Sequence, residues 1–256
     1  MFTNYGEKEV SLAIIDAFYS FLRDAITSDV VIVGGGPSGL IAGYYLSKAG
    51  KKVVIVEKNN APGGGAWSGG YLMNQLTVRA PGQEVLQEMG VELKEVQPGL
   101  FVGDAQYVCA SLIRAAIGQG VKILNLTNCE DIVLKNGKVC GVVINWSPIQ
   151  FLPGPMRMLD PIVLESKAVI DSTGHDASVV AMLKRRKLAE ITGEGAMHIA
   201  VSEDQVVEKT GRIFPGLYVC GMSVSAVFGL PRMGPTFGSM YLSGRKVAQV
   251  ILEDIE

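Results

Sequence analysis

The chain of 256 residues is predicted to be an α/β protein, and three observations lead to this class. The run DVVIV (29–33) is continuously apolar, as expected for a strand buried in a parallel sheet. The turn GGGPSG follows at once, and then come a helical pattern and a second apolar strand. Further apolar strands return late in the chain. We therefore expect a Rossmann-like dinucleotide-binding fold, flavoprotein-like and three-layered, with a small inserted β subdomain.

The expected elements follow one another closely. An amphipathic helix over 7–26 precedes the first strand, because its apolar residues recur at helical spacing. The first strand leads into a helix over 38–49 and a strand over 51–58, which complete a βαβ unit. The glycine-rich segment 59–74 is too long to be a simple connection.

The second part of the chain adds shorter elements. A hairpin is expected over 129–146, turning at Asn136-Gly137. The other expected elements are a short helix within 80–93, a helix and a strand over 107–128, an irregular segment over 147–160, strands over 166–174 and 211–222, and a helix within 234–255. We interpret 1–256 as a single dinucleotide-binding domain with an N-terminal helix and a hairpin and irregular insertion around 129–165.

Composition excludes several classes of partner. The net charge is −2, with both signs spread along the chain, so no nucleic-acid or membrane surface is expected. No apolar stretch is long enough for a membrane span. The four cysteines form no CxxC pair, which argues against a zinc ribbon or a disulfide framework. Glu7, Lys8 and Glu9 stand where a signal peptide needs an apolar run, so we expect a cytoplasmic protein.

Gly34, Gly36 and Gly39 fit the pattern GxGxxG between a strand and a helix. Glycines there allow the backbone to approach a pyrophosphate, and the helix N-terminus offers free N–H groups. Glu57 ends the second strand, where its carboxylate can bind ribose hydroxyls and repel a 2′-phosphate, so NAD or FAD is favoured over NADP. The alternative is a glycine turn that only packs a strand on a helix. Flavoproteins usually end the late strand with Gly-Asp, whereas this chain has Gly221-Met222.

Asp160 and His175 form a second candidate constellation. An imidazole and a carboxylate suit Fe(II), Mn or Zn and leave positions open for substrate. The alternative for His175 is a histidine that hydrogen-bonds in a βα turn, and from the residues alone this alternative is favoured. Asp176 is interpreted as the N-cap of the following helix, and His198, among apolar residues, as a core histidine.

Arg232 lies in GLPRMGPTFG, where glycines and prolines imply a fixed loop before a helix. A guanidinium held there could bind a carboxylate in bidentate fashion. A surface arginine without a ligand is an equal alternative.

Taken together, the motifs VVIVGGGPSGL, NNAPGGGAWSGG, GVVINW, DSTGHDA and GLPRMGPTFGSMYLSG resemble the thiamine thiazole synthase family over nearly the whole chain. The resemblance implies that NAD is a substrate: nicotinamide leaves, the sugar isomerises and condenses with glycine, and sulfur enters with Fe(II) to give an adenylated thiazole carboxylate. It implies that Asp160 and His175 bind iron and that Arg232 binds the glycine carboxylate. Nucleotide contacts are expected at Gly34, Gly36, Ser38, Gly39, Glu57, Lys58, Gly65, Cys129 (through its backbone), Met158 and Met222.

One position departs from part of the family. Some members carry a cysteine two residues before the metal-binding aspartate and give up its sulfur, whereas others have histidine there and use free sulfide. This chain has Met158, whose thioether cannot form a thiolate. A sulfide-dependent enzyme is therefore expected. The resemblance also implies ring-like homo-oligomers, such as octamers, with sites shared between subunits.

Two other hypotheses remain open. One is a small FAD- or NAD-dependent oxidoreductase, which would purify yellow if it held a flavin. The other is a dinucleotide-binding scaffold whose active site has decayed.

Overall fold

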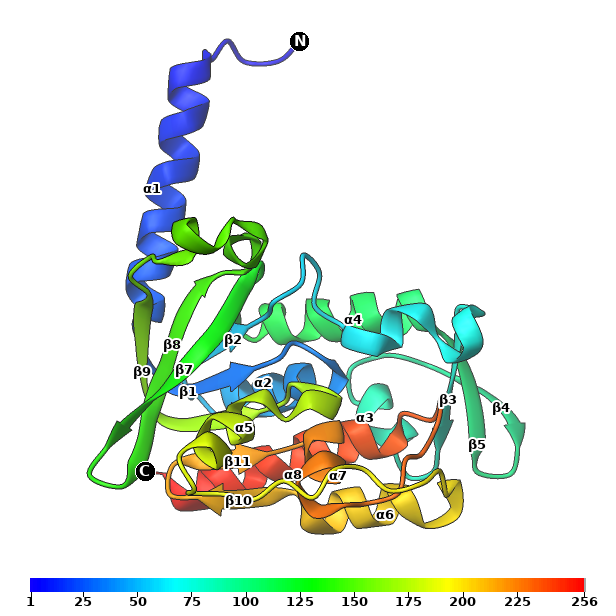
Figure 1. Ribbon diagram of the computed structural model, residues 1–256. Coiled ribbons are helices and arrows are strands. Elements are labelled where there is room, and N and C mark those ends of the chain that lie inside the picture. The colour runs from blue at the N-terminus through cyan, green and yellow to red at the C-terminus, as the bar shows by residue number, and fades with distance from the viewer. Residues whose placement is uncertain (256) are drawn as a thin grey trace.

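The computed structural model describes residues 1–255 and confirms the α/β class (Figure 1). The main sheet has eight strands, of which six run in the order β10-β11-β9-β1-β2-β6, and the hairpin β7-β8 joins through β9. Its strands are β1 (Thr27–Val33), β2 (Val53–Val56), β6 (Lys122–Leu124), β7 (Thr127–Lys135), β8 (Lys138–Trp146), β9 (Ile162–Asp171), β10 (Gly211–Phe214) and β11 (Leu217–Val219).

The centre of this sheet is parallel. β1 pairs with β2 on one side and with β9 on the other, with Val31 opposite both Val54 and Val169. These apolar residues are fully buried. Continuous apolar runs form these strands because both faces of the sheet are covered.

The helix α2 (Pro37–Lys48) lies against β1 and β2 and packs on two further helices, α4 (Ala105–Gly118) and α8 (Gly238–Asp254). α2 and α8 approach closely at Gly244, where a side chain would collide with the Ser38 carbonyl oxygen and Ile41. The other helices are α3 (Gln83–Gln87), α5 (Ser178–Arg185), α6 (Ile199–Lys209) and α7 (Met222–Phe228). α5 packs on β7 and β9, so the sheet lies between helical layers.

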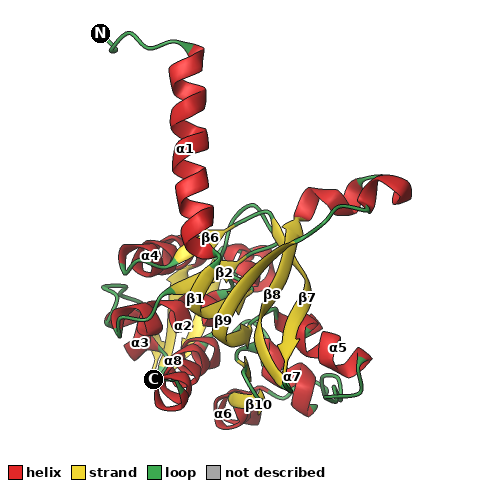
Figure 2. Ribbon diagram, turned by 90° about the vertical axis from the view of Figure 1, so that its left-hand side faces the viewer, coloured by secondary structure: helices red, strands yellow, loops and turns green. Residues whose placement is uncertain are grey.

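The hairpin turns where expected, with Asn136 and Gly137 at φ 51° and 74°. It is part of the main sheet, because β8 pairs with β9 from Gly141↔Glu165 to Ile144↔Ile162. Beyond β8 the chain forms two 3-10 turns, η3 (Ser147–Phe151) and η4 (Gly154–Arg157), which project away from the body (Figure 2).

A second, smaller sheet was not expected at its position. It is antiparallel, in the order β3-β5-β4, and consists of β3 (Gln75–Arg79), β4 (Lys94–Gln97) and β5 (Leu100–Asp104). It agrees with the expected small β subdomain, but it lies ahead of the hairpin in the chain. The glycine-rich segment before it contains the turns η1 (Gly64–Ser68) and η2 (Gly70–Leu72).

The N-terminal helix α1 (Glu7–Ala25) extends from the body, and both views show it free along most of its length (Figures 1 and 2). Its apolar residues Val10, Ile14 and Phe18 are exposed, and only its last turns pack on the core. No helix among residues 1–255 is long and apolar enough to cross a membrane.

One expected strand was wrong. Residues 211–222 do not form one strand, because β10 and β11 are antiparallel and the chain reverses at Pro215 and Gly216. Gly216 has a φ of 76°, and a side chain there would collide with the Val139 carbonyl oxygen. Met222 then begins a helix rather than ending a strand.

Candidate functional site

A cavity of about 630 Å³ opens at the carboxyl ends of β1, β2 and β9. Ligands bind at this edge in open α/β sheets. Of the residues expected to contact a ligand, the cavity is lined by Gly34, Gly36, Ser38, Glu57, Lys58, Gly65, Cys129, His175, Met222 and Arg232. The fold therefore brings together residues that are almost 200 positions apart in the sequence.

The glycine turn has the geometry that an anion site requires. Gly34 has a φ of 100°, and a side chain there would collide with the Ser172 backbone. A side chain at Gly39, which lies beneath the cavity, would collide with the Gly34 carbonyl oxygen. The N-cap of α2, Gly36, has no side-chain cap, so the helix presents its N–H groups to the cavity.

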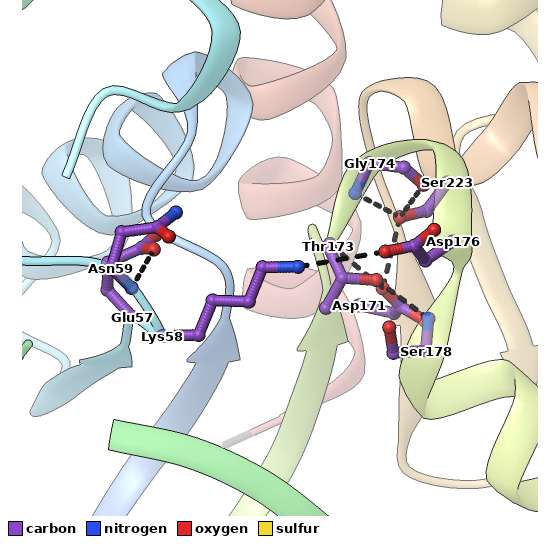
Figure 3. Close-up of polar contacts among 9 residues, drawn as sticks. All are labelled: Glu57, Lys58, Asn59, Asp171, Thr173, Gly174, Asp176, Ser178 and Ser223. Carbon is purple, nitrogen blue, oxygen red and sulfur yellow. Dashed lines mark hydrogen bonds and ion pairs between the residues drawn. The ribbon is translucent and has the colours of Figure 1, made fainter. Parts of the chain in front are cut away.

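Glu57 is buried at the end of β2, and both of its oxygens are engaged. Oε2 accepts from Gly35 N at 2.8 Å and Oε1 from Asn59 N at 2.7 Å. The carboxylate thus ties the glycine turn to the segment after β2. Each oxygen keeps a further lone pair for a ligand. Lys58 points across the cavity, and its Nζ lies 3.7 Å from Asp176 Oδ2 (Figure 3).

Asp171 fixes the turn that carries His175. It is fully buried at the end of β9. Its Oδ1 accepts from Thr173 N, Thr173 Oγ1 and Ser223 Oγ at 3.0, 2.7 and 3.0 Å, and its Oδ2 from Val179 N and Val180 N, both at 2.9 Å. Ser223 Oγ also accepts from Gly174 N at 3.1 Å (Figure 3). One carboxylate thus binds the turn, α5 and α7 together.

The expected N-cap role of Asp176 is wrong. Ala177 is the N-cap residue of α5, and Thr173 Oγ1 accepts from Ser178 N at 2.7 Å. Asp176 lies in the short 3-10 turn η5 (Gly174–Asp176) instead.

His175 is 65% exposed in its side chain and lines the cavity, and its Nδ1 lies 2.6 Å from Glu194 Oε1. Arg232 is exposed and lines the same cavity. Its backbone is held by His198 N, which donates to Arg232 O at 3.0 Å. The interpretation of His198 as a core histidine is wrong, because the residue is exposed and is the N-cap residue of α6.

Asp160 and Met158 do not line the cavity. Both are exposed on the projecting segment after β8, and Met158 is 89% exposed. Over residues 1–255, no three His, Cys, Asp or Glu side chains lie close enough to hold a metal ion. A single chain therefore brings one of the two expected metal ligands, His175, to the cavity.

The thiol at the cavity is poorly suited to give up sulfur. Burial raises the pKa of the Cys129 thiol to about 12, so almost none is thiolate at neutral pH. Burial likewise raises the pKa of Cys220 and of Cys109 to about 12. Cys140 lies at the other end of the sheet, beside Lys135 and Glu165.

Three residues of the site escaped sequence reasoning: Asp171, Glu194 and Ser223. Asp171 ends an apolar strand, as Glu57 does, and this shared position was a usable signal. Glu194 and Ser223 lie in no motif, and only the fold brings them to the turn.

The fold and the cavity define an α/β protein with a Rossmann-like fold. The L-proline dehydrogenase of Pyrococcus horikoshii shares the fold, with a TM-score of 0.61 over 90% of this chain and 94% of that one, at 12% identity. Residues 11–237 match the Thi4 family, and the chain belongs to that family.

Three relatives are similar to this chain over nearly its full length. The thiamine thiazole synthase of Aeropyrum pernix is 48% identical over 255 residues, which cover 100% of this chain and 94% of the relative. That of Pyrococcus horikoshii is 45% identical over 98% of both chains. The crystal structure of Thermovibrio ammonificans THI4 is similar with a TM-score of 0.94 and 41% identity, over 98% of this chain and 99% of that one. The chain is thus a homologue of the thiamine thiazole synthases.

Proposed function

We propose that this protein is a thiamine thiazole synthase of thiamine biosynthesis that forms the adenylated thiazole carboxylate from NAD, glycine and free sulfide with Fe(II). Full-length similarity to relatives of that name supports the reaction class. The observation that carries the proposal is the cavity, which combines a dinucleotide turn with His175 and Arg232.

The residues divide the substrate between them. The uncapped N-terminus of α2 binds the pyrophosphate of NAD, and Glu57 accepts hydrogen bonds from the adenosine ribose. Arg232 binds the glycine carboxylate through its planar guanidinium. With the ADP end of NAD bound at α2 and Glu57 and glycine bound at Arg232, the nicotinamide-bearing sugar lies near His175, where the chemistry takes place.

Fe(II) fits an imidazole and a carboxylate as donors. His175 and Asp160 of the partner subunit would hold it, and it would supply Lewis-acid assistance to sulfur addition. Support for a shared site comes from the exposed apolar residues of α1 and of the projecting segment, namely Val10, Ile14, Phe18, Phe151, Met156 and Leu159. A ring-like homo-oligomer would cover these surfaces.

Free sulfide is the proposed sulfur source because the residues near the cavity offer no accessible thiolate. Cys129 is buried with a raised pKa, and Met158 is a thioether. The enzyme then remains intact and turns over repeatedly.

Anaerobic incubation with NAD, glycine, Fe(II) and sulfide, followed by mass analysis, tests the reaction. We expect more than one adenylated thiazole per chain and an unchanged protein mass. A loss of about 34 Da, the mass of hydrogen sulfide, would instead show that a cysteine of the chain is the donor. A yellow protein that binds flavin and forms no thiazole would favour the oxidoreductase.

The shared site has its own test. Asp160→Ala and His175→Ala should each be inactive, and oligomers reassembled from a mixture of the two should regain activity. Each mixed interface can combine an intact His175 with an intact Asp160. Mixed oligomers without activity would contradict a site shared between subunits.

A further inference from the structure

Glu194 lies behind the imidazole of His175. The distance between Glu194 Oε1 and His175 Nδ1 is 2.6 Å, which is a short hydrogen bond. His175 lines the cavity, whereas Glu194 does not. The Glu194 side chain is 16% exposed and that of His175 is 65% exposed, as expected if Glu194 lies beneath the imidazole.

The carboxylate determines which ring nitrogen carries hydrogen. An ionised carboxylate only accepts hydrogen bonds, so His175 Nδ1 must be the donor. A neutral imidazole with hydrogen on Nδ1 has its lone pair on Nε2. Glu194 therefore selects Nε2 as the nitrogen that can bind an electrophile.

The backbone on both sides of Glu194 is anchored. Gly193 N donates to Ala226 O and Gly195 N donates to Leu230 O, both at 2.9 Å. Gly193 has a φ of 90°, which favours glycine at this position. The carboxylate is thus attached to a fixed segment rather than to a free loop.

The same segment also positions Arg232. Arg232 N donates to Ala196 O at 3.3 Å, and His198 N donates to Arg232 O at 3.0 Å. Residues 192–198 therefore contact His175 through a side chain and Arg232 through the backbone. The two functional residues share one support.

We propose that Glu194 is a positioning residue of this site, which fixes the Nδ1–H tautomer and the ring orientation of His175 so that Nε2 is free to bind a divalent metal ion. The claim that Nε2 binds a metal ion rests on the proposed function, whereas the claim that Glu194 fixes the tautomer of His175 does not. A carboxylate behind a metal-binding histidine typically changes metal affinity by about 10–100-fold.

The tautomer can be observed directly, because the chain has only two histidines. ¹⁵N-histidine NMR of the metal-free protein, assigned with His198→Asn, should show the Nδ1–H form at His175. Glu194→Ala should shift His175 to the Nε2–H form or to a mixture. Glu194→Gln keeps an acceptor oxygen of the same reach and should retain most of the Nδ1–H form. Glu190→Ala, which removes an exposed carboxylate ahead of the segment, is the matched control.

Metal binding gives the second measurement. Co(II) affinity should fall about 10–100-fold in Glu194→Ala and less in Glu194→Gln, while NAD affinity stays unchanged. An unchanged tautomer in Glu194→Ala, or a shifted tautomer with unchanged Co(II) affinity, would overturn the proposal. If the wild-type protein binds no Co(II) at His175, the metal assignment of the proposed function fails, and the NMR result alone decides the role of Glu194.

Discussion

Asp171→Asn probes the hydrogen-bond network beneath the site. The carboxylate is fully buried and accepts five hydrogen bonds, three on Oδ1 and two on Oδ2. An asparagine keeps one oxygen and replaces the other with an NH₂ group. The less damaging orientation places this group at Oδ2, where it faces the N–H groups of Val179 and Val180.

The expected destabilisation follows from these contacts. A hydrogen bond to a charged group contributes about 1.5–3 kcal/mol, so losing two gives about 3–6 kcal/mol before relaxation. Relaxation lowers this figure, and we expect about 3 kcal/mol or more. For a chain of this size each kcal/mol lowers the thermal midpoint by about 2–4 °C, so a fall of at least about 6–12 °C is expected.

The assay is thermal and urea unfolding at one fixed protein concentration, because oligomerisation makes the midpoint depend on concentration. Asp176→Asn is the control, since that carboxylate is 68% exposed and its ion pair spans 3.7 Å. It should change stability by less than about 1 kcal/mol. If Asp171→Asn lowers the free energy of unfolding by less than about 1 kcal/mol, the five hydrogen bonds to this carboxylate do not stabilise the fold as argued.

Three further predictions concern ligands and pH. Glu57→Ala should weaken NAD binding by about 1–3 kcal/mol in calorimetric titration, and an unchanged affinity in a folded protein would contradict the ribose contact. Arg232→Lys keeps the charge and loses the planar fork, so glycine should bind much more weakly with NAD near normal; equal loss of both ligands would indicate a structural arginine. The Lys52 backbone N–H donates to Asp29 and holds the pKa of this carboxyl below its usual value. The ionised carboxylate therefore stabilises the fold at pH values above its pKa in the unfolded chain, and this stabilisation is lost as the pH falls through its pKa in the folded chain. The stability difference between wild type and Asp29→Asn should therefore narrow between about pH 6 and about pH 2, and a constant difference would contradict it.

The sequence predicted the elements whose signals are local. The βαβ unit was recognisable because an apolar strand, a glycine turn and a helix are contiguous, and Asn136-Gly137 specified the hairpin turn. The small sheet was expected, but its position in the chain was missed, because its strands are only four or five residues long and β4 is exposed throughout, so little alternation is visible. The buried helix α7 was missed because it has seven residues and follows directly on a strand.

The site was predictable only in part, and for a related reason. Gly34, Glu57, His175 and Arg232 could be named because each lies in a turn with a local signature. Glu194 could not be named, since nothing near it in the sequence points to His175, nineteen residues earlier. A long-range contact of this kind depends on how α7 and the segment after α5 are packed, which no local pattern encodes.

Asp160 shows a different limit, because even the folded chain does not bring it to the cavity. Its segment has exposed apolar side chains, Phe151 and Met156 among them. Exposed apolar side chains that lie together are typical of a surface that contacts another protein. In one chain the glycine turn, His175 and Arg232 line the same cavity, and residues 192–198 hydrogen-bond to the last two. Asp160, which the proposed reaction needs as the second metal ligand, is not among these residues. A site divided in this way would couple metal binding to assembly, because isolated chains would hold the metal through His175 without the second ligand.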